Sequence, residues 1–100
     1  MKEIQATQVT TYLNDYQLID VRESFETEKG MIPGALHIPL GELPGKLSTL
    51  GKGKPLLFIC RSGARSERAA LFSEAQGYQT ANMTGGMIQY SCRTILPAHT

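Results

Sequence analysis

The sequence predicts one α/β domain, built on a mostly parallel sheet of about five strands with helices on both faces. The run Leu56–Ile59 has the length and unbroken apolar character of a strand buried on both sides, as in a parallel sheet covered by helices. A short loop leads from it into a helix expected over residues 66–76, which Gly77 is placed to end. The length of 100 residues suits one domain, residues 1–100, and we expect residues 91–100 to form a C-terminal tail.

The segments before this run predict alternating short strands and helices. Strands are expected at residues 3–4, 18–21 and 35–38. Thr7 can cap a helix that carries Val9, Tyr12 and Leu13 at helical spacing. Residues 24–29 predict a short, charged helical turn, and residues 40–50 an amphipathic helix despite Pro44 and Gly45.

The segments after residue 77 are shorter. Residues 80–83 predict a weak strand, and the pair Gly85 and Gly86 opens a last short helix. His37 precedes the pair Ile38 and Pro39, and with no acid partner near it in sequence we interpret it as structural.

Composition excludes several classes of function. Hydrophobic residues make up 41% of the chain and charged residues 19%, which is typical of a globular protein and not of a disordered one. The net charge of +1 argues against a broad surface for nucleic acid or membrane. The N-terminal residues lack an apolar signal region, so we expect a soluble, cytoplasmic protein. Two cysteines and the histidines His37 and His99 offer no metal-ligand spacing, so neither a metal nor a cofactor is expected.

Cys60 is the candidate nucleophile, because it stands at the carboxyl end of the predicted central strand. Open α/β sheets bind their ligands at that edge, where backbone N–H groups and the positive end of the following helix converge. A free thiol has a pKa of about 8.5, and a helix N-terminus with nearby arginines lowers it. Arg61 and Arg65 are placed to supply that charge. The alternative, a buried structural cysteine, is common for cysteine in general.

The loop from Cys60 to Arg65 spans six residues, and its N–H groups can point inward to form an anion-binding nest. Its residues, with the serine that follows, resemble the active-site loop of the rhodanese-type sulfurtransferases. The seven residues that carry this resemblance are Cys60, Arg61, Ser62, Gly63, Ala64, Arg65 and Ser66. Upstream, Asp20 to Glu23, Glu26 and residues 30–40 are similar to the family's first signature; downstream, Gly85, Gly86 and Tyr90 resemble its closing segment.

The resemblance covers roughly residues 18–90 with three motifs in order, and it departs from the family at packing positions. Met31 stands where a histidine is usual, Thr27 where an aromatic residue is usual, and Tyr90 where a tryptophan is usual. We interpret all three as packing residues. In this family Asp20 and Arg22 would support the active-site side of the domain, and an ion pair or turn cap is favoured for them over direct contact with substrate.

The resemblance implies a rhodanese fold and a two-step transfer of sulfane sulfur through a Cys60 persulfide. The donor would be thiosulfate or another small anionic sulfur compound, and the acceptor cyanide or a thiol. Arg61 and Arg65 would attract the donor, while Ser62, Gly63, Ala64 and Ser66 contribute mainly backbone, with Ser66 also able to cap the helix.

Two other functions stay open at this stage. A persulfide carrier that passes sulfur to an acceptor protein would use the same Cys60 chemistry, and an exposed apolar patch beside the loop would support it. A cysteine-based phosphatase or arsenate reductase is disfavoured, because the active-site loop of those enzymes resembles a Cys-x5-Arg pattern, which is one residue longer than the loop from Cys60 to Arg65. Cys92 is interpreted as a partly buried small hydrophobic residue, with a resolving thiol as the alternative.

Overall fold

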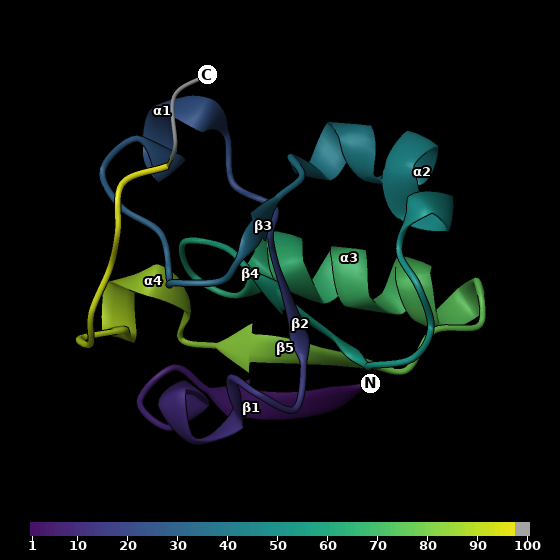
Figure 1. Ribbon diagram of the computed structural model, residues 1–100, viewed down its shortest axis with the longest axis horizontal. Coiled ribbons are helices and arrows are strands. Elements are labelled where there is room, and N and C mark those ends of the chain that lie inside the picture. Colours follow the sequence, from purple (N-terminus) through teal and green to yellow (C-terminus); the bar gives the residue numbers. More distant parts are fainter. Residues whose placement is uncertain (98–100) are drawn as a thin grey trace.

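The computed structural model describes residues 1–97, and its centre is a five-stranded sheet in which every neighbouring pair of strands is parallel (Figure 1). The strand order is β1-β5-β4-β2-β3, so β4 lies in the middle. The strands are β1 (Lys2–Gln5), β2 (Gln17–Asp20), β3 (Leu36–His37), β4 (Leu56–Ile59) and β5 (Thr80–Thr84). The predicted α/β class and parallel sheet are confirmed.

Helices cover both faces of this sheet, as predicted. The α-helices are α1 (Ser24–Thr27), α2 (Leu43–Lys46), α3 (Ala64–Ala75) and α4 (Gly86–Gln89). Within residues 1–97, three 3-10 helices accompany them: η1 (Val9–Tyr12), η2 (Leu40–Glu42) and η3 (Leu47–Thr49). One apolar core joins α2 and α3 to the sheet, and a second core on the other face includes Val9 of η1, with Met87 of α4 packed against it.

The central strand owes its position to its residues. All four side chains of β4 are buried, two in each core: Leu56 and Phe58 face α3, while Leu57 and Ile59 face the opposite side. Removing this much apolar surface from water is the main force that holds the sheet between its helices. The carboxyl end of β4 is thereby fixed between two packed layers.

The structure corrects two predicted helices. Residues 40–50 form η2, α2 and η3 in place of one continuous helix. Pro44 has no N–H to donate to the Leu40 carbonyl, which accounts for the break between η2 and α2. The helix expected from Thr7 is only the 3-10 helix η1, which follows Gln8 without a side-chain cap. The β-branched residues at its start lose rotamer freedom in a helix, so a longer one is disfavoured.

Residues 91–96 of the expected C-terminal tail are exposed, and hydrogen bonds tie part of this segment to the domain. Ile95 and Met31 form an antiparallel bridge with backbone N···O distances of 2.7 and 2.8 Å, and the Tyr90 hydroxyl donates to the Arg93 carbonyl. Met31, Thr27 and Tyr90 are buried, which confirms that they are packing residues. Residues 98–100 of the expected tail, His99 among them, lie outside the described residues.

Candidate active site

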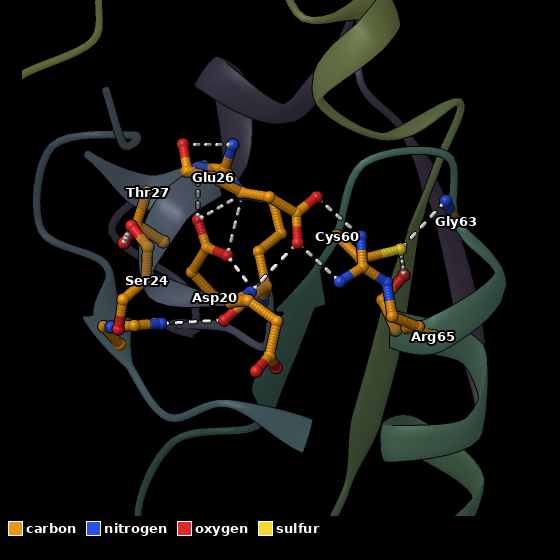
Figure 2. A network of polar contacts seen from close by, with 11 residues as sticks. Asp20, Ser24, Glu26, Thr27, Cys60, Gly63 and Arg65 are labelled. Atoms are coloured by element: carbon orange, nitrogen blue, oxygen red, sulfur yellow. Dashed lines mark hydrogen bonds and ion pairs between the residues drawn. The ribbon is translucent and has the colours of Figure 1, made fainter. Parts of the chain in front are cut away.

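Cys60 follows β4 directly and is fully buried, and its loop leads into α3, which begins four residues later at Ala64. Gly63 is the N-cap of α3 and has φ +106°, a left-handed conformation that glycine adopts without steric cost. This turn directs the Gly63 N–H at the Cys60 Sγ, 3.0 Å away (Figure 2). The helix therefore begins two residues earlier than expected, with Ser66 inside its first turn and not at its cap.

The loop lowers the pKa of the Cys60 thiol. Burial acts in the opposite direction and raises it, but the Ser66 hydroxyl and the backbone N–H groups of Ser66, Gly63 and Ser62 outweigh burial. From the sequence, the lower pKa of Cys60 was expected to come from the charge of the helix terminus and the arginines. In the structure, hydrogen-bond donors of the loop and of the first turn of α3 lower it. A thiol surrounded by such donors ionises more readily than a free cysteine.

Asn82 of β5 is a site residue that sequence reasoning missed. Its Nδ2 donates to the Gly63 carbonyl at 3.2 Å, and its Oδ1 accepts a hydrogen bond from the Ser66 hydroxyl. Ser66 Oγ lies 3.2 Å from Cys60 Sγ. An asparagine in the middle of a buried strand is unusual, since asparagine is depleted in strands, and this was the one signal in the sequence.

The start of α4 holds the loop from the other side. Met87 donates its N–H to the Cys60 carbonyl at 2.9 Å, and Ile88 donates to the Arg61 carbonyl at 3.0 Å. Gly86 lies so close that a Cβ built on it would stand 2.2 Å from the Arg61 carbonyl oxygen. Gly86 therefore lets the start of α4 contact the backbone of the loop, a role that the sequence did not reveal.

Arg65 forms a bidentate ion pair with Glu26 of α1 (Figure 2). The two N···O distances are 2.6 and 2.8 Å. This hydrogen bonding lowers the pKa of Glu26 to about 2 and raises the pKa of Arg65. Glu26 also accepts from the Glu23 N–H in a capping box at the start of α1. The charge of Arg65 is thus engaged in joining α1 to α3.

Asp20 and Arg22 form the ion pair that the sequence favoured. Their side chains are buried, with Arg22 Nη2 and Nε donating to the Asp20 carboxylate at 2.8 to 3.1 Å. Arg22 Nη2 also donates to the Gly30 carbonyl at 2.8 Å, and His37 Nε2 donates to the Arg22 carbonyl at 2.7 Å. This network ties the ends of β2 and β3 to the segment after α1, beside the loop.

A groove of about 330 Å³ lies next to the loop, lined by Arg61 and residues of α1 and α4. The exposed fractions of Phe25 and Ile88 on its walls are 69% and 60%. Lys29 and Arg61 bring positive charge to it, and among residues 1–97 neither forms an ion pair. The larger hollow of about 390 Å³ lies elsewhere, between Pro44 and Tyr78, away from Cys60.

Cys92 is exposed, which corrects the expectation of partial burial, and no disulfide joins it to Cys60. It lies on the segment after α4, in which residues 91–96 are all exposed. Within the part of the chain that the structure describes, no group of three or more metal-binding side chains comes together. None of the helices in that part is both long enough and apolar enough to cross a membrane.

Comparisons with known proteins agree with this geometry. The model of the rhodanese-like domain family matches residues 5–91. A putative sulfurtransferase, YtwF of Bacillus subtilis, is 48% identical over 77% of this chain and 75% of its own length. A putative sulfur carrier protein of the same organism, YrkF, is 41% identical over 77% of this chain and 42% of its own.

Solved structures show the same fold. A rhodanese-like domain protein from Staphylococcus aureus matches with a TM-score of 0.89 at 29% identity, over 98% of this chain and 100% of the other. A rhodanese-related protein from Thermoplasma volcanium matches with a TM-score of 0.91 at 29% identity, over 97% and 100%. The chain belongs to the rhodanese-like domain family.

Proposed function

We propose that this protein is a sulfurtransferase in which Cys60 carries a sulfane sulfur as a persulfide. The observation that supports this most directly is the placement of Cys60 Sγ, which accepts the Gly63 N–H at 3.0 Å at the start of α3. A cysteine with a lowered pKa, held among N–H donors, is a nucleophile that can also bear a negative product. The sulfurtransferase relatives support the same chemistry.

The reaction has two balanced steps. The Cys60 thiolate attacks the outer sulfur of thiosulfate; a new S–S bond forms, the old S–S bond breaks, and sulfite leaves with the electron pair. The product, Cys60–S–S⁻, keeps one negative charge, which the backbone N–H groups of Ser62, Gly63 and Ser66 around the sulfur stabilise. A thiol acceptor or cyanide then takes the outer sulfur and returns Cys60 as the thiolate.

Arg61 is the residue that we assign to attracting the anionic donor. Its side chain is exposed at the rim of the groove and has no ion-pair partner among residues 1–97, whereas Arg65 is occupied by Glu26. An exposed guanidinium at the edge of a groove concentrates anions there. Ser62 and Ala64 contribute backbone to the loop, and Asp20 with Arg22 supports its edge.

Intact-mass spectrometry tests this function. The protein is measured before and after incubation with thiosulfate, and separately with a low-molecular-weight persulfide. A gain of one sulfur, about 32 Da, is expected in the parent and in Cys92→Ser but not in Cys60→Ser, and cyanide should remove it as thiocyanate. Failure of both donors to add sulfur to Cys60 would exclude the proposal and turn attention to phosphate or arsenate substrates.

A protein acceptor is the second candidate, and the groove beside the loop favours it. Phe25 and Ile88 expose apolar side chains there, with Lys29 and Arg61 on the same groove. This chemistry suits a partner whose reactive thiol lies beside an apolar side chain and a carboxylate. Phe25→Ser should then slow sulfur transfer to such a protein while leaving transfer to cyanide unchanged. If the variant and the parent transferred sulfur at the same rate to the protein acceptor as well, docking at this groove would be excluded.

A further inference from the structure

The buried hydroxyl of Ser66 lies between two groups that can each accept its proton. On one side is Cys60 Sγ at 3.2 Å, and on the other is the Asn82 Oδ1. The exposed fractions of Cys60 and Ser66 are 0%, and that of Asn82 is 2%, so water does not offer an alternative donor. The two steps of the proposed sulfur transfer do not use Asn82.

The orientation of the Asn82 amide is fixed by its other neighbour. Nδ2 faces the Gly63 carbonyl at 3.2 Å, and a carbonyl oxygen only accepts. Turning the amide over would place two acceptors against each other, so Oδ1 must face Ser66. Since Oδ1 also only accepts, the single proton of the Ser66 hydroxyl points at Asn82, and the neutral Cys60 thiol donates its own proton to Ser66 Oγ.

Ionisation of Cys60 breaks this arrangement. A thiolate donates nothing, so Ser66 must either turn its proton to the sulfur and leave Asn82 Oδ1 without a donor, or stay with Asn82 and direct a lone pair at the anion. The first alternative leaves a buried amide oxygen without a donor. The second sets a lone pair of Ser66 against the thiolate, which then relies on backbone donors such as the Gly63 N–H, so both are costly. We propose that Asn82 is a positioning residue that competes with the Cys60 thiolate for the single proton of Ser66.

The competition ends when sulfur is loaded, a step that rests on the proposed function. In Cys60–S–S⁻ the negative charge lies on the outer sulfur, among the loop N–H groups, and the inner Sγ is neutral. Ser66 can then return its proton to Asn82 at no cost. Asn82 therefore favours the persulfide over the free thiolate, and it also leaves the thiolate more basic and more nucleophilic.

The charged groups around Cys60, Ser66 and Asn82 do not account for the effect that we assign to Asn82. From α3 and α1, Arg65 and Glu26 face each other as an ion pair, with Glu23 nearby at the start of α1. Arg61 of the loop is exposed, the buried charges of Asp20 and Arg22 on the β2 side are paired, and α4 carries no charged residue. On β1, the register partner of Asn82 is the exposed Glu3. Substituting Asn82 leaves these charges unchanged.

Titration of Cys60 by the pH dependence of its alkylation tests the proposal, with Cys92→Ser as the parent because Cys92 is exposed. Asn82→Val removes the acceptor, keeps a residue suited to a strand, and leaves the Gly63 carbonyl bonded to the Glu67 N–H at 3.2 Å. Asn82→Ala serves as a second variant, and circular dichroism checks that each one folds. The Cys60 pKa should fall by about one unit in either variant, the value of one buried hydrogen bond.

Ser66→Ala makes the test specific. By itself it should raise the Cys60 pKa, and in its background Asn82→Val should have no effect, since no proton is left to compete for. If Asn82→Val merely loosened the loop, the Cys60 pKa would rise instead, and it would rise in the Ser66→Ala background as well. A raised Cys60 pKa in Asn82→Val, or an effect of Asn82→Val that persists without the Ser66 hydroxyl, overturns the proposal. In equilibrium with an organic persulfide, Asn82→Val should lower the ratio of persulfide to thiolate by up to about tenfold. A parent that takes up no sulfur refutes the proposed function, while the titration still decides the role of Asn82.

Discussion

Gly86→Ala should disrupt the candidate site without touching the thiol. The added Cβ would stand 2.2 Å from the Arg61 carbonyl oxygen and 2.6 Å from the Ser62 nitrogen. Both are backbone atoms that cannot turn aside, so α4 must move off the loop. Gly86 also has φ +59°, where a residue with a side chain is strained.

The expected loss of stability follows from these two effects. Left-handed strain costs about 1–2 kcal/mol, and losing the hydrogen bonds from Met87 and Ile88 to the loop carbonyls costs about 0.5–1.5 kcal/mol each. The free energy of unfolding should therefore fall by about 2–5 kcal/mol in urea denaturation. Alkylation of Cys60 near neutral pH should slow as well, because the displaced loop no longer aims its N–H groups at the sulfur.

Gly34→Ala is the matched control. Gly34 has φ +86°, and no atom lies within 4 Å of the point where its Cβ would stand, so this substitution carries the backbone strain without the clash. It should cost about 1–2 kcal/mol and leave Cys60 reactivity unchanged. Equal losses for the two substitutions, or normal alkylation of Cys60 in Gly86→Ala, would refute the idea that α4 positions the loop.

Three further substitutions test the charged side chains around the candidate site. Glu26→Gln removes the carboxylate whose pKa lies at about 2. The ion pair with Arg65 contributes its full stabilisation of the folded state above pH 4.5, the ordinary pKa of a glutamate, and this contribution is lost as the pH falls through about 2. The shift corresponds to about 3 kcal/mol, which exposure of the pair reduces to about 1–2, so the parent should exceed the variant by that amount in urea at pH 7 and match it near pH 2. Asp20→Ala should cost about 3–5 kcal/mol in the same assay, because it leaves the buried Arg22 charge without its partner, and a loss below 1 kcal/mol would contradict the burial of that charge. Arg61→Ala should slow sulfur loading from thiosulfate about tenfold, more at low than at high salt, without changing stability; an equal effect on loading from a neutral donor would argue against charge attraction.

The sequence was sufficient to place the elements that are defined by contiguous residues. Leu56–Ile59 was predicted as a strand with its observed bounds, because four adjacent apolar residues admit few alternatives. The loop that follows, with Cys60 at the strand end, was found for the same reason. Predictions weakened where local preferences conflict, as at Pro44, which interrupts the expected helix between η2 and α2.

The sequence by itself determined which residue is the candidate nucleophile, and the tertiary structure decided which groups surround it. Glu26 lies 39 positions from the Arg65 that it pairs with, and Asn82 lies 16 positions from Ser66. Such pairs meet only because parallel strands bring distant segments to one edge of the sheet, and a local pattern contains no record of that. The physical reason is that a hydrogen bond depends on distance and direction in space, while a motif fixes only the order of residues along the chain.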